Sequence, residues 1–203
     1  GNTIAGNWIG LNAAGTGGAG NQQGVNIGNA NNNTIGGSSA ADRNVISANS
    51  GQGISITTDN GSSNGNLVRG NYIGTSADGM AALGNSGQGV YINAANNTIG
   101  GTSSAARNVI AGNIGSGIQF NGAGATGNVV IGNYIGTNAS GTADVDGTAQ
   151  VNGANGISII NGASNNRIGT NADGSNDVQE RNLISGNNWV GVDIVGSGTS
   201  GNV

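Results

Sequence analysis

Residues 66–92 read NLVRGNYIGTSADGMAALGNSGQGVYI, and residues 97–120 read NTIGGTSSAARNVIAGNIGSGIQF. Both stretches contain three short patterns in one order: Asn-x-Ile/Val, a second Asn-x-Ile, and Gly-Val/Ile-x-Ile/Phe. Each pattern is a few strand-forming residues bounded by Gly, Asn, Ser or Thr, which are turn residues. The two stretches decide the fold because the rest of the chain repeats them.

The repeat runs through the whole sequence. The first pattern begins at Asn2, Asn33, Asn66, Asn97, Asn128 and Asn166, and it starts again at Asn202. The two kinds of unit alternate, so that equivalent units lie 64 residues apart at Asn2 and Asn66 and again at Asn33 and Asn97. A fixed period with no helical periodicity is typical of a β-solenoid.

Stacking explains how such short strands hold together. If each unit forms one coil, equivalent strands pair in parallel about 4.8 Å apart, and their backbone groups bond to the coils above and below. The sequence therefore predicts an all-β fold, a right-handed parallel β-helix of about six coils with three short strands each. We expect residues 1–203 to form a single domain.

Alternation along the strands predicts four inward rows of aliphatic side chains. The third strand supplies two rows: Val25, Ile54, Val90, Ile118, Ile157 and Val192, then Ile27, Ile56, Ile92, Phe120, Ile159 and Ile194. The first strand supplies Ile4, Ile35, Val68, Ile99, Val130 and Ile168, and the second Ile9, Ile46, Ile73, Ile110, Ile135 and Ile184. The Asn residues that open the first two patterns form rows of seven and six, which predicts ladders of stacked amides.

Composition excludes several function classes. The chain has 43 Gly but no Cys, and no His or Lys occurs in it, so thiolate and imidazole metal sites, disulfides and a Ser-His-Asp triad are excluded. Five Arg against nine acidic residues give a net charge of −4, which argues against nucleic-acid binding. No apolar run is long enough for membrane insertion.

The alternation of GNYIGT with NTIGGT, RNVI and a Gly-Ile/Val strand resembles the repeats of large secreted or surface bacterial β-helix proteins. These belong to the wider pectate-lyase-like group of right-handed parallel β-helices, with polygalacturonases, tailspikes and autotransporter passengers. The resemblance covers essentially the whole chain and implies an extracellular or cell-surface location of the bacterial type. Because this chain lacks Lys and has few carboxylates, we expect no enzymatic activity and no cofactor.

Acidic residues gather in the two segments that lengthen the repeat. They are Asp144, Asp146, Asp173, Asp177 and Glu180. Carboxylates brought together by neighbouring coils would bind Ca²⁺ or act as the acid/base pair of a glycosidase. The alternative is that they keep a surface insertion soluble.

Two rows flank the second strand. Arg43, Arg107 and Arg181 precede it in alternate coils, and Trp8, Tyr72 and Tyr134 begin it in the others. The Arg row predicts contact with an acidic polysaccharide or a neighbouring rod, or else local pairing with Asp42, Glu180 or a carbonyl. Strict alternation places the aromatic row outside, together with Val45, Val109 and Leu183, as a sugar-stacking or rod-to-rod stripe. The alternatives are that the longer loops cover it, or that the frame is off by one residue and the row is partly internal.

Asn202 and Val203 begin a seventh coil, and neither terminus carries an evident cap. We therefore expect a segment of a longer array or a subunit that stacks end to end into a fibre. The function expected first is structural, as part of an extracellular rod, fibre or filament. A carbohydrate-binding or adhesin surface module is the alternative, and a polysaccharide lyase or hydrolase the third.

Overall fold

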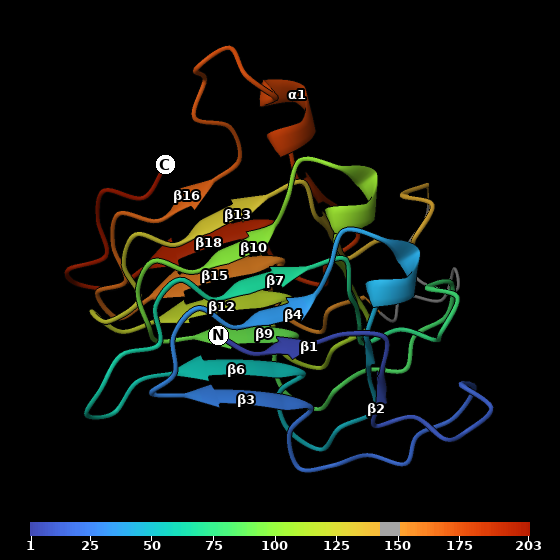
Figure 1. Cartoon of the computed structure of the whole chain (residues 1–203). Coiled ribbons are helices and arrows are strands. Elements are labelled where there is room, and N and C mark those ends of the chain that lie inside the picture. The colour runs from blue at the N-terminus through green and yellow to red at the C-terminus, as the bar shows by residue number, and fades with distance from the viewer. Residues whose placement is uncertain (143–150) are drawn as a thin grey trace.

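The computed structural model describes residues 1–142 and 151–203. In these residues the chain winds as a right-handed parallel β-helix whose six coils begin at the six Asn residues of the first pattern (Figure 1). Each coil contributes one strand to each of three parallel sheets, and every sheet has six strands in the described residues. The predicted fold class is therefore confirmed.

The strands follow one another in each sheet in the order of the coils. The first sheet holds β1 (Thr3–Ile4), β4 (Thr34–Gly36), β7 (Leu67–Arg69), β10 (Thr98–Gly100), β13 (Val129–Ile131) and β16 (Arg167–Ile168). The second holds β2 (Trp8–Ile9), β5 (Val45–Ile46), β8 (Tyr72–Ile73), β11 (Val109–Ile110), β14 (Tyr134–Ile135) and β17 (Leu183–Ile184). The third holds β3 (Val25–Gly28), β6 (Ile54–Thr57), β9 (Val90–Ile92), β12 (Ile118–Asn121), β15 (Ile157–Ile160) and β18 (Val192–Val195).

The register keeps like residues opposite one another. Ile110 of β11, for example, lies opposite Ile73 and Ile135 in the neighbouring coils. Such pairing buries each aliphatic side chain between two others of its kind, and this is why strands of two residues suffice.

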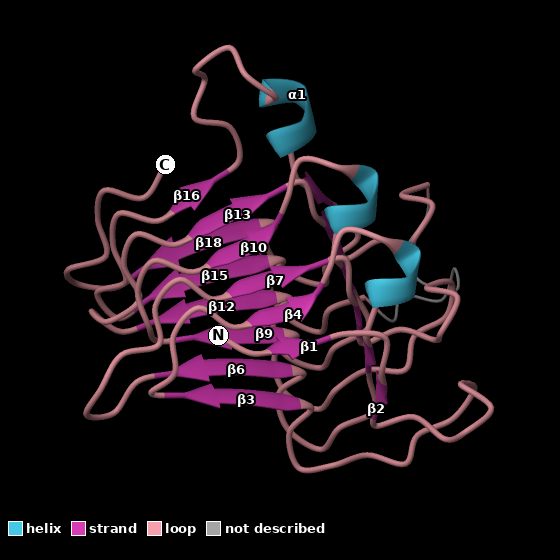
Figure 2. Cartoon of the chain, in the orientation of Figure 1, coloured by secondary structure: helices cyan, strands magenta, loops and turns pink. Residues whose placement is uncertain are grey.

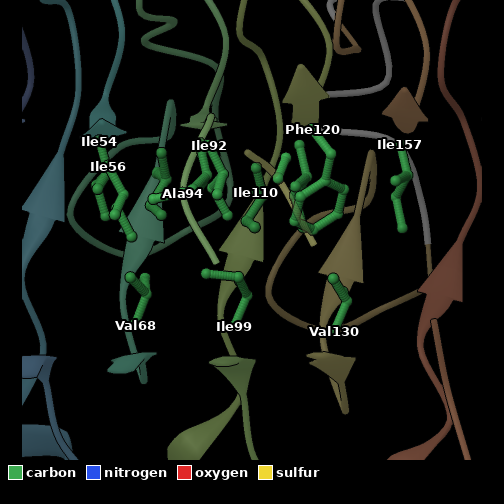
Figure 3. Close-up of a cluster of buried hydrophobic side chains, with 14 of the residues drawn as sticks. Ile54, Ile56, Val68, Ile92, Ala94, Ile99, Ile110, Phe120, Val130 and Ile157 are labelled. Carbon is green, nitrogen blue, oxygen red and sulfur yellow. The ribbon is translucent and has the colours of Figure 1, made fainter. Parts of the chain in front are cut away.

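The core is the stack of inward rows between the three sheets (Figure 3). Its largest fully buried side chains are Phe120, Ile35, Ile46, Ile54, Ile56, Ile73, Ile92, Ile99, Ile110, Ile118, Ile135 and Ile157. In the last coil the prediction of burial is wrong, since Val192 is 39% exposed and Ile194 is 51% exposed. These two side chains belong to the inward rows, but in the described residues no complete coil lies over them.

Three helical turns were not expected. Two are 3-10 turns, Ala40–Asp42 and Ser104–Ala106, and the third is α1 (Asp177–Glu180). They stand in one column on the same side of the solenoid (Figure 2), each just before a strand of the second sheet. A single turn is too short to leave a helical period in the sequence.

The two kinds of coil thus differ in where they add residues. We call coils one, three and five the loop coils, because in each a long segment separates the strand of the second sheet from the strand of the third. Coils two, four and six are the turn coils, because each carries one of the helical turns before that strand.

Candidate functional site

Stacked asparagines form the most regular polar feature of the molecule. Asn108, fully buried, accepts at Oδ1 from the backbone N–H of Asn71 at 2.9 Å and from its Nδ2 at 3.1 Å. Its own Nδ2 donates to the Val68 carbonyl at 2.8 Å and to Asn133 Oδ1 at 2.9 Å. Each rung therefore satisfies a buried amide and the orphan backbone N–H at the bend.

Three such ladders run along the solenoid. The first joins Asn2, Asn33, Asn66, Asn97, Asn128, Asn166 and Asn202. The second joins Asn7, Asn44, Asn71, Asn108, Asn133 and Asn182. These two confirm the predicted rows.

The third ladder, which joins Asn21, Asn49, Asn85, Asn113, Asn152 and Asn187, was missed. It stands before the Gly-Val/Ile strand, where the spacing to that Gly is three residues in the first coil and four in the others. Aligning the coils on that Gly would have found it.

The ladders give the solenoid a direction. In the interior of the second ladder each asparagine sends its backbone N–H and its amide to the coil that follows and receives at Oδ1 from the coil that precedes. Among the described residues, Oδ1 of Asn7 and of Asn21 accepts no hydrogen bond, and the backbone N–H groups of Asn182 and Asn187 donate none. Acceptors therefore remain open at the first coil and donors at the last.

The Arg and aromatic rows prove to be one stacked row. The guanidinium carbon of Arg43 lies 4.1 Å from the ring centroid of Tyr72, and that of Arg107 lies 4.0 Å from the centroid of Tyr134. Arg107 Nε also donates to the Gly132 carbonyl at 3.2 Å. Arg43 and Arg107 thus each cover the Tyr of the loop coil that follows, in a cation–π contact.

The long loops close over the same aromatic side chains from another side. Their tips share the pattern Asn/Ser-Ala-x-Gly, and the Gly N–H donates to the carbonyl of the residue that opens the pattern, at 2.9–3.0 Å, in all three loop coils. Gly79 has a φ of +74°, and a Cβ there would lie 2.8 Å from Tyr72 Cε2. Gly15 and Gly141 meet Trp8 and Tyr134 in the same way.

In the loop of the third coil, the Ser76 hydroxyl and the Met80 N–H both donate to Asp78 Oδ1. These bonds, the first above all, lower the pKa of the Asp78 carboxyl. The Asp78 carboxylate therefore stabilises the conformation of the loop tip.

The predicted apolar stripe is wrong at two positions. Val45 and Val109 are both buried, at 2% exposure, where the stripe required them outside. Val109 lies in register between Tyr72 and Tyr134, and two larger neighbours on adjacent strands shield the smaller side chain. Tyr72 and Tyr134 are half-buried, while Trp8 is 50% exposed.

Trp8 and Arg181 stand at opposite ends of the stacked row. Trp8 belongs to the first coil, so no Arg of a preceding coil lies over it. Arg181 belongs to the sixth coil and is exposed, and among the described residues no aromatic ring lies under it. The row is thus incomplete at both ends in complementary ways.

The acidic candidates have local partners where they are described. Glu180 is buried and accepts from Arg167 Nη1 at 3.1 Å, whereas the sequence suggested Arg181 as its partner. Asp177 accepts from Thr170 Oγ1 at 2.7 Å, and Asp173 from the Ser175 N–H at 2.7 Å. Asp144 and Asp146 lie outside the described residues.

No group of three or more acidic side chains placed to hold a metal occurs within residues 1–142 and 151–203. Calcium binding stays a prediction. Asp42, the other suggested Arg partner, instead accepts from the N–H and the hydroxyl of Ser39 at 3.1 and 2.8 Å.

Three surface hollows lie at the two ends of the solenoid, and another lies between the loop tips of the first and third coils. One is lined by Asn2, Ile4, Ile27 and Ala30 of the first coil, with residues of the second. Two others lie on the last coil, one beside Arg181 and α1 and one between Ile168 and Ile194. Both ends expose core positions.

Comparisons with protein-family models, with curated proteins and with solved structures find no match for this chain. None of the helices in the described part of the chain has the length and apolar character needed to span a membrane.

Proposed function

We propose that this chain is a structural unit, part of an extracellular rod, fibre or filament. The observation that carries the proposal is the continuity of the three asparagine ladders and three sheets from the first coil to the last. A stack in which every bend is hydrogen-bonded to the next resists bending and local unfolding along its whole length.

The side chains that would carry chemistry support the same role. Tyr72 and Tyr134 lie under arginines and against loop glycines, so packing within the protein covers their rings. The Glu180 carboxylate forms an ion pair with Arg167. We therefore propose that the chain is not an enzyme and needs no cofactor.

The proposed location is extracellular or at the cell surface of a bacterium, within the pectate-lyase-like group of β-helices. Two features of the sequence support it: the resemblance of the repeats to secreted β-helix proteins and a low-charge composition rich in Gly and Asn. Immunogold labelling of producing cells tests the location. Gold confined to the cell interior would overturn it.

Carbohydrate binding is the second candidate, and one observation favours it. Trp8 presents half of its surface to solvent at the end of the stacked row, as an aromatic platform for a sugar ring does. In this account the chain would act as an adhesin module.

A glycan array separates the two candidates. The structural role predicts no glycan bound above background by the purified chain, and no unsaturated or reducing-end product from acidic polysaccharides. Binding that Trp8→Ala abolishes, while Arg43→Ala in the interior leaves it unchanged, would replace the structural proposal with the carbohydrate-binding one. Product release would replace it with a lyase or hydrolase.

A further inference from the structure

Six asparagines of the chain are followed directly by glycine. They are Asn60, Asn64, Asn121, Asn152, Asn155 and Asn161. An Asn-Gly pair is the place where an asparagine loses its amide most readily, because asparagine is a labile residue and glycine has no side chain to hinder the ring that forms. The fold treats the six pairs differently.

The loss of the amide is a reaction of the backbone. The glycine nitrogen attacks Cγ of the preceding asparagine, so that an N–Cγ bond forms and the Cγ–Nδ2 bond breaks. Nδ2 leaves as ammonia and takes the proton of the glycine N–H. Water then opens the cyclic imide at either of its carbonyl carbons and gives aspartate or isoaspartate, with no change of oxidation state.

Coil pairing protects five of the six pairs. A glycine N–H that donates a hydrogen bond cannot lose its proton and turn toward the side chain until that bond opens. The N–H groups of Gly65, Gly122, Gly153 and Gly156 donate at 2.7–3.1 Å to the carbonyls of Asn96, Ile160, Asn113 and Val190, and Gly162 donates to Thr199 Oγ1 at 3.0 Å.

Most of the asparagine side chains in these pairs are held as well. Asn152 lies in the third ladder, and its amide bonds to neighbours on both sides. Asn121 Oδ1 accepts from Asn161 Nδ2 at 2.8 Å, and Asn155 Nδ2 donates to Asp193 at 3.1 Å. In these four pairs both reacting groups are therefore engaged.

Asn60 and Gly61 form the exception. Both are exposed, in the connection between β6 and β7. Within residues 1–142 and 151–203, neither the Asn60 amide nor the Gly61 N–H has a hydrogen-bond partner.

The groups around this pair are bonded, so the turn itself is fixed. The Gly61 carbonyl accepts from Thr58 Oγ1 at 2.8 Å, and the Asp59 N–H donates to Asn29 Oδ1 at 3.1 Å. The reacting amide and N–H are thus open to water in a turn whose other polar groups are engaged.

We propose that Asn60 is a modification site, the position at which the folded chain loses an amide, with the Gly61 nitrogen as nucleophile and water as co-reactant. The product carries one more negative charge, next to Asp59. Asn60 belongs to none of the three ladders, so the reaction leaves them intact. The inference goes beyond the structural role and does not depend on it.

Asn64 is a matched control four positions away. Its side chain also makes no hydrogen bond to any described residue, but the Gly65 N–H donates to the Asn96 carbonyl at 2.9 Å. Trypsin, which cleaves after arginine, releases both asparagines in the peptide 44–69, which contains no other Asn-Gly pair. The two sites are therefore compared within one molecule.

The experiment incubates the folded chain in mildly alkaline buffer and follows both sites over time by tandem mass spectrometry of this peptide. An unincubated sample, digested in parallel, corrects for conversion during digestion. Asn60 is expected to convert at least about tenfold faster than Asn64, because reaction at Asn64 requires the coil pairing to open. Equal rates in the folded chain would overturn the proposal.

The same incubation in urea separates the fold from the local sequence. Without coil pairing the two sites are expected to convert at rates within about twofold of each other. A tenfold preference for Asn60 that persists in urea would also overturn the proposal, since the sequence around the site and not the open hydrogen bond would then be its cause.

Isoelectric focusing of the intact chain gives an independent readout. The unsubstituted chain should gain one acidic band as the reaction proceeds. Asn60→Gln should lose that band, whereas Asn64→Gln should keep it. An acidic band that forms at the same rate in Asn60→Gln would contradict the assignment of the site.

Discussion

At the scale of the residue, asparagine forms hydrogen bonds at the bends that no other side chain reproduces. Its amide donates and accepts in the same plane, so one side chain receives from the coil before it and gives to the coil after it. The fully buried Asn108 side chain makes three such bonds and donates a fourth to the Val68 carbonyl of the preceding coil. Gln is too long for the bend and Asp lacks the donors.

Asn108→Ala is therefore expected to lower the free energy of unfolding by about 2–4 kcal/mol, because it leaves the Asn71 N–H buried without a partner and removes the amide bonds to the Val68 carbonyl and to Asn133. The matched control is Asn7→Ala at the exposed start of the same ladder, which should cost less than about 1 kcal/mol. Urea denaturation measures both. Equal losses of unfolding free energy in the two variants would mean that the buried ladder bonds stabilise the protein no more than an exposed asparagine does.

Gly79→Ala tests the loop that closes over Tyr72. The new alanine would have to keep the positive φ of Gly79, and its methyl group would meet both Ala139 Cβ and the Tyr72 ring. Gly122→Ala is the control, since Gly122 has a φ of +86° but open space around it. The first variant should be at least about 1 kcal/mol less stable than the second by thermal or urea unfolding. No difference would show that the loop does not pack on the ring.

At the scale of the element, strands of two to four residues derive their stability from their neighbours and not from their own length. A strand with a coil on both sides buries its aliphatic side chain fully, as Ile110 does, whereas Ile184 in the last coil is half-buried. Stability should therefore be highest in the middle coils and fall toward the last.

Ile110→Ala is expected to cost about 2–5 kcal/mol, as for a fully buried large-to-small change. Ile184→Ala makes the same change at the same position of the coil and should cost at least about 1 kcal/mol less. In hydrogen exchange of the unsubstituted chain, the backbone amides of β11 should likewise be protected more than those of β17. Equal costs and equal protection would show that the last coil is as well packed as the interior.

The sequence predicted the strands and the two ladders well because each rests on a local pattern that recurs in register. The buried Val45 and Val109 were placed outside because alternation within one strand ignores the larger side chains on the next. The third ladder was missed because the chain is one residue shorter before Gly24 than before its counterparts.

The stacking of the arginine side chains on the aromatic rings could not be predicted from the sequence. Arg43 and Tyr72 lie 29 positions apart in the sequence and were assigned to separate rows, each with its own function. Only the geometry shows that the guanidinium covers the ring. Likewise the turns at 40–42, 104–106 and 177–180 are each one turn long, below the length at which helical periodicity is visible.

At the scale of the whole molecule, the solenoid is a polar object with different ends. Its two tryptophans mark them, since Trp8 lies in the first coil and Trp189, 75% exposed, in the last. In the described residues the last coil exposes core positions, and the Oδ1 atoms of Asn7 and Asn21 in the first coil accept no hydrogen bond. Between these ends the three ladders run in one direction without interruption, which supports the proposed role in a rod or fibre.

Electron microscopy of the native material, with diffraction along any filament axis, tests the central claim most directly. The structural account predicts filaments or rods of constant width with an axial repeat near 4.8 Å, the spacing of stacked coils. Discrete short particles at every concentration, with no such repeat, would contradict the structural account. They would favour the alternative, a module that binds carbohydrate on its surface.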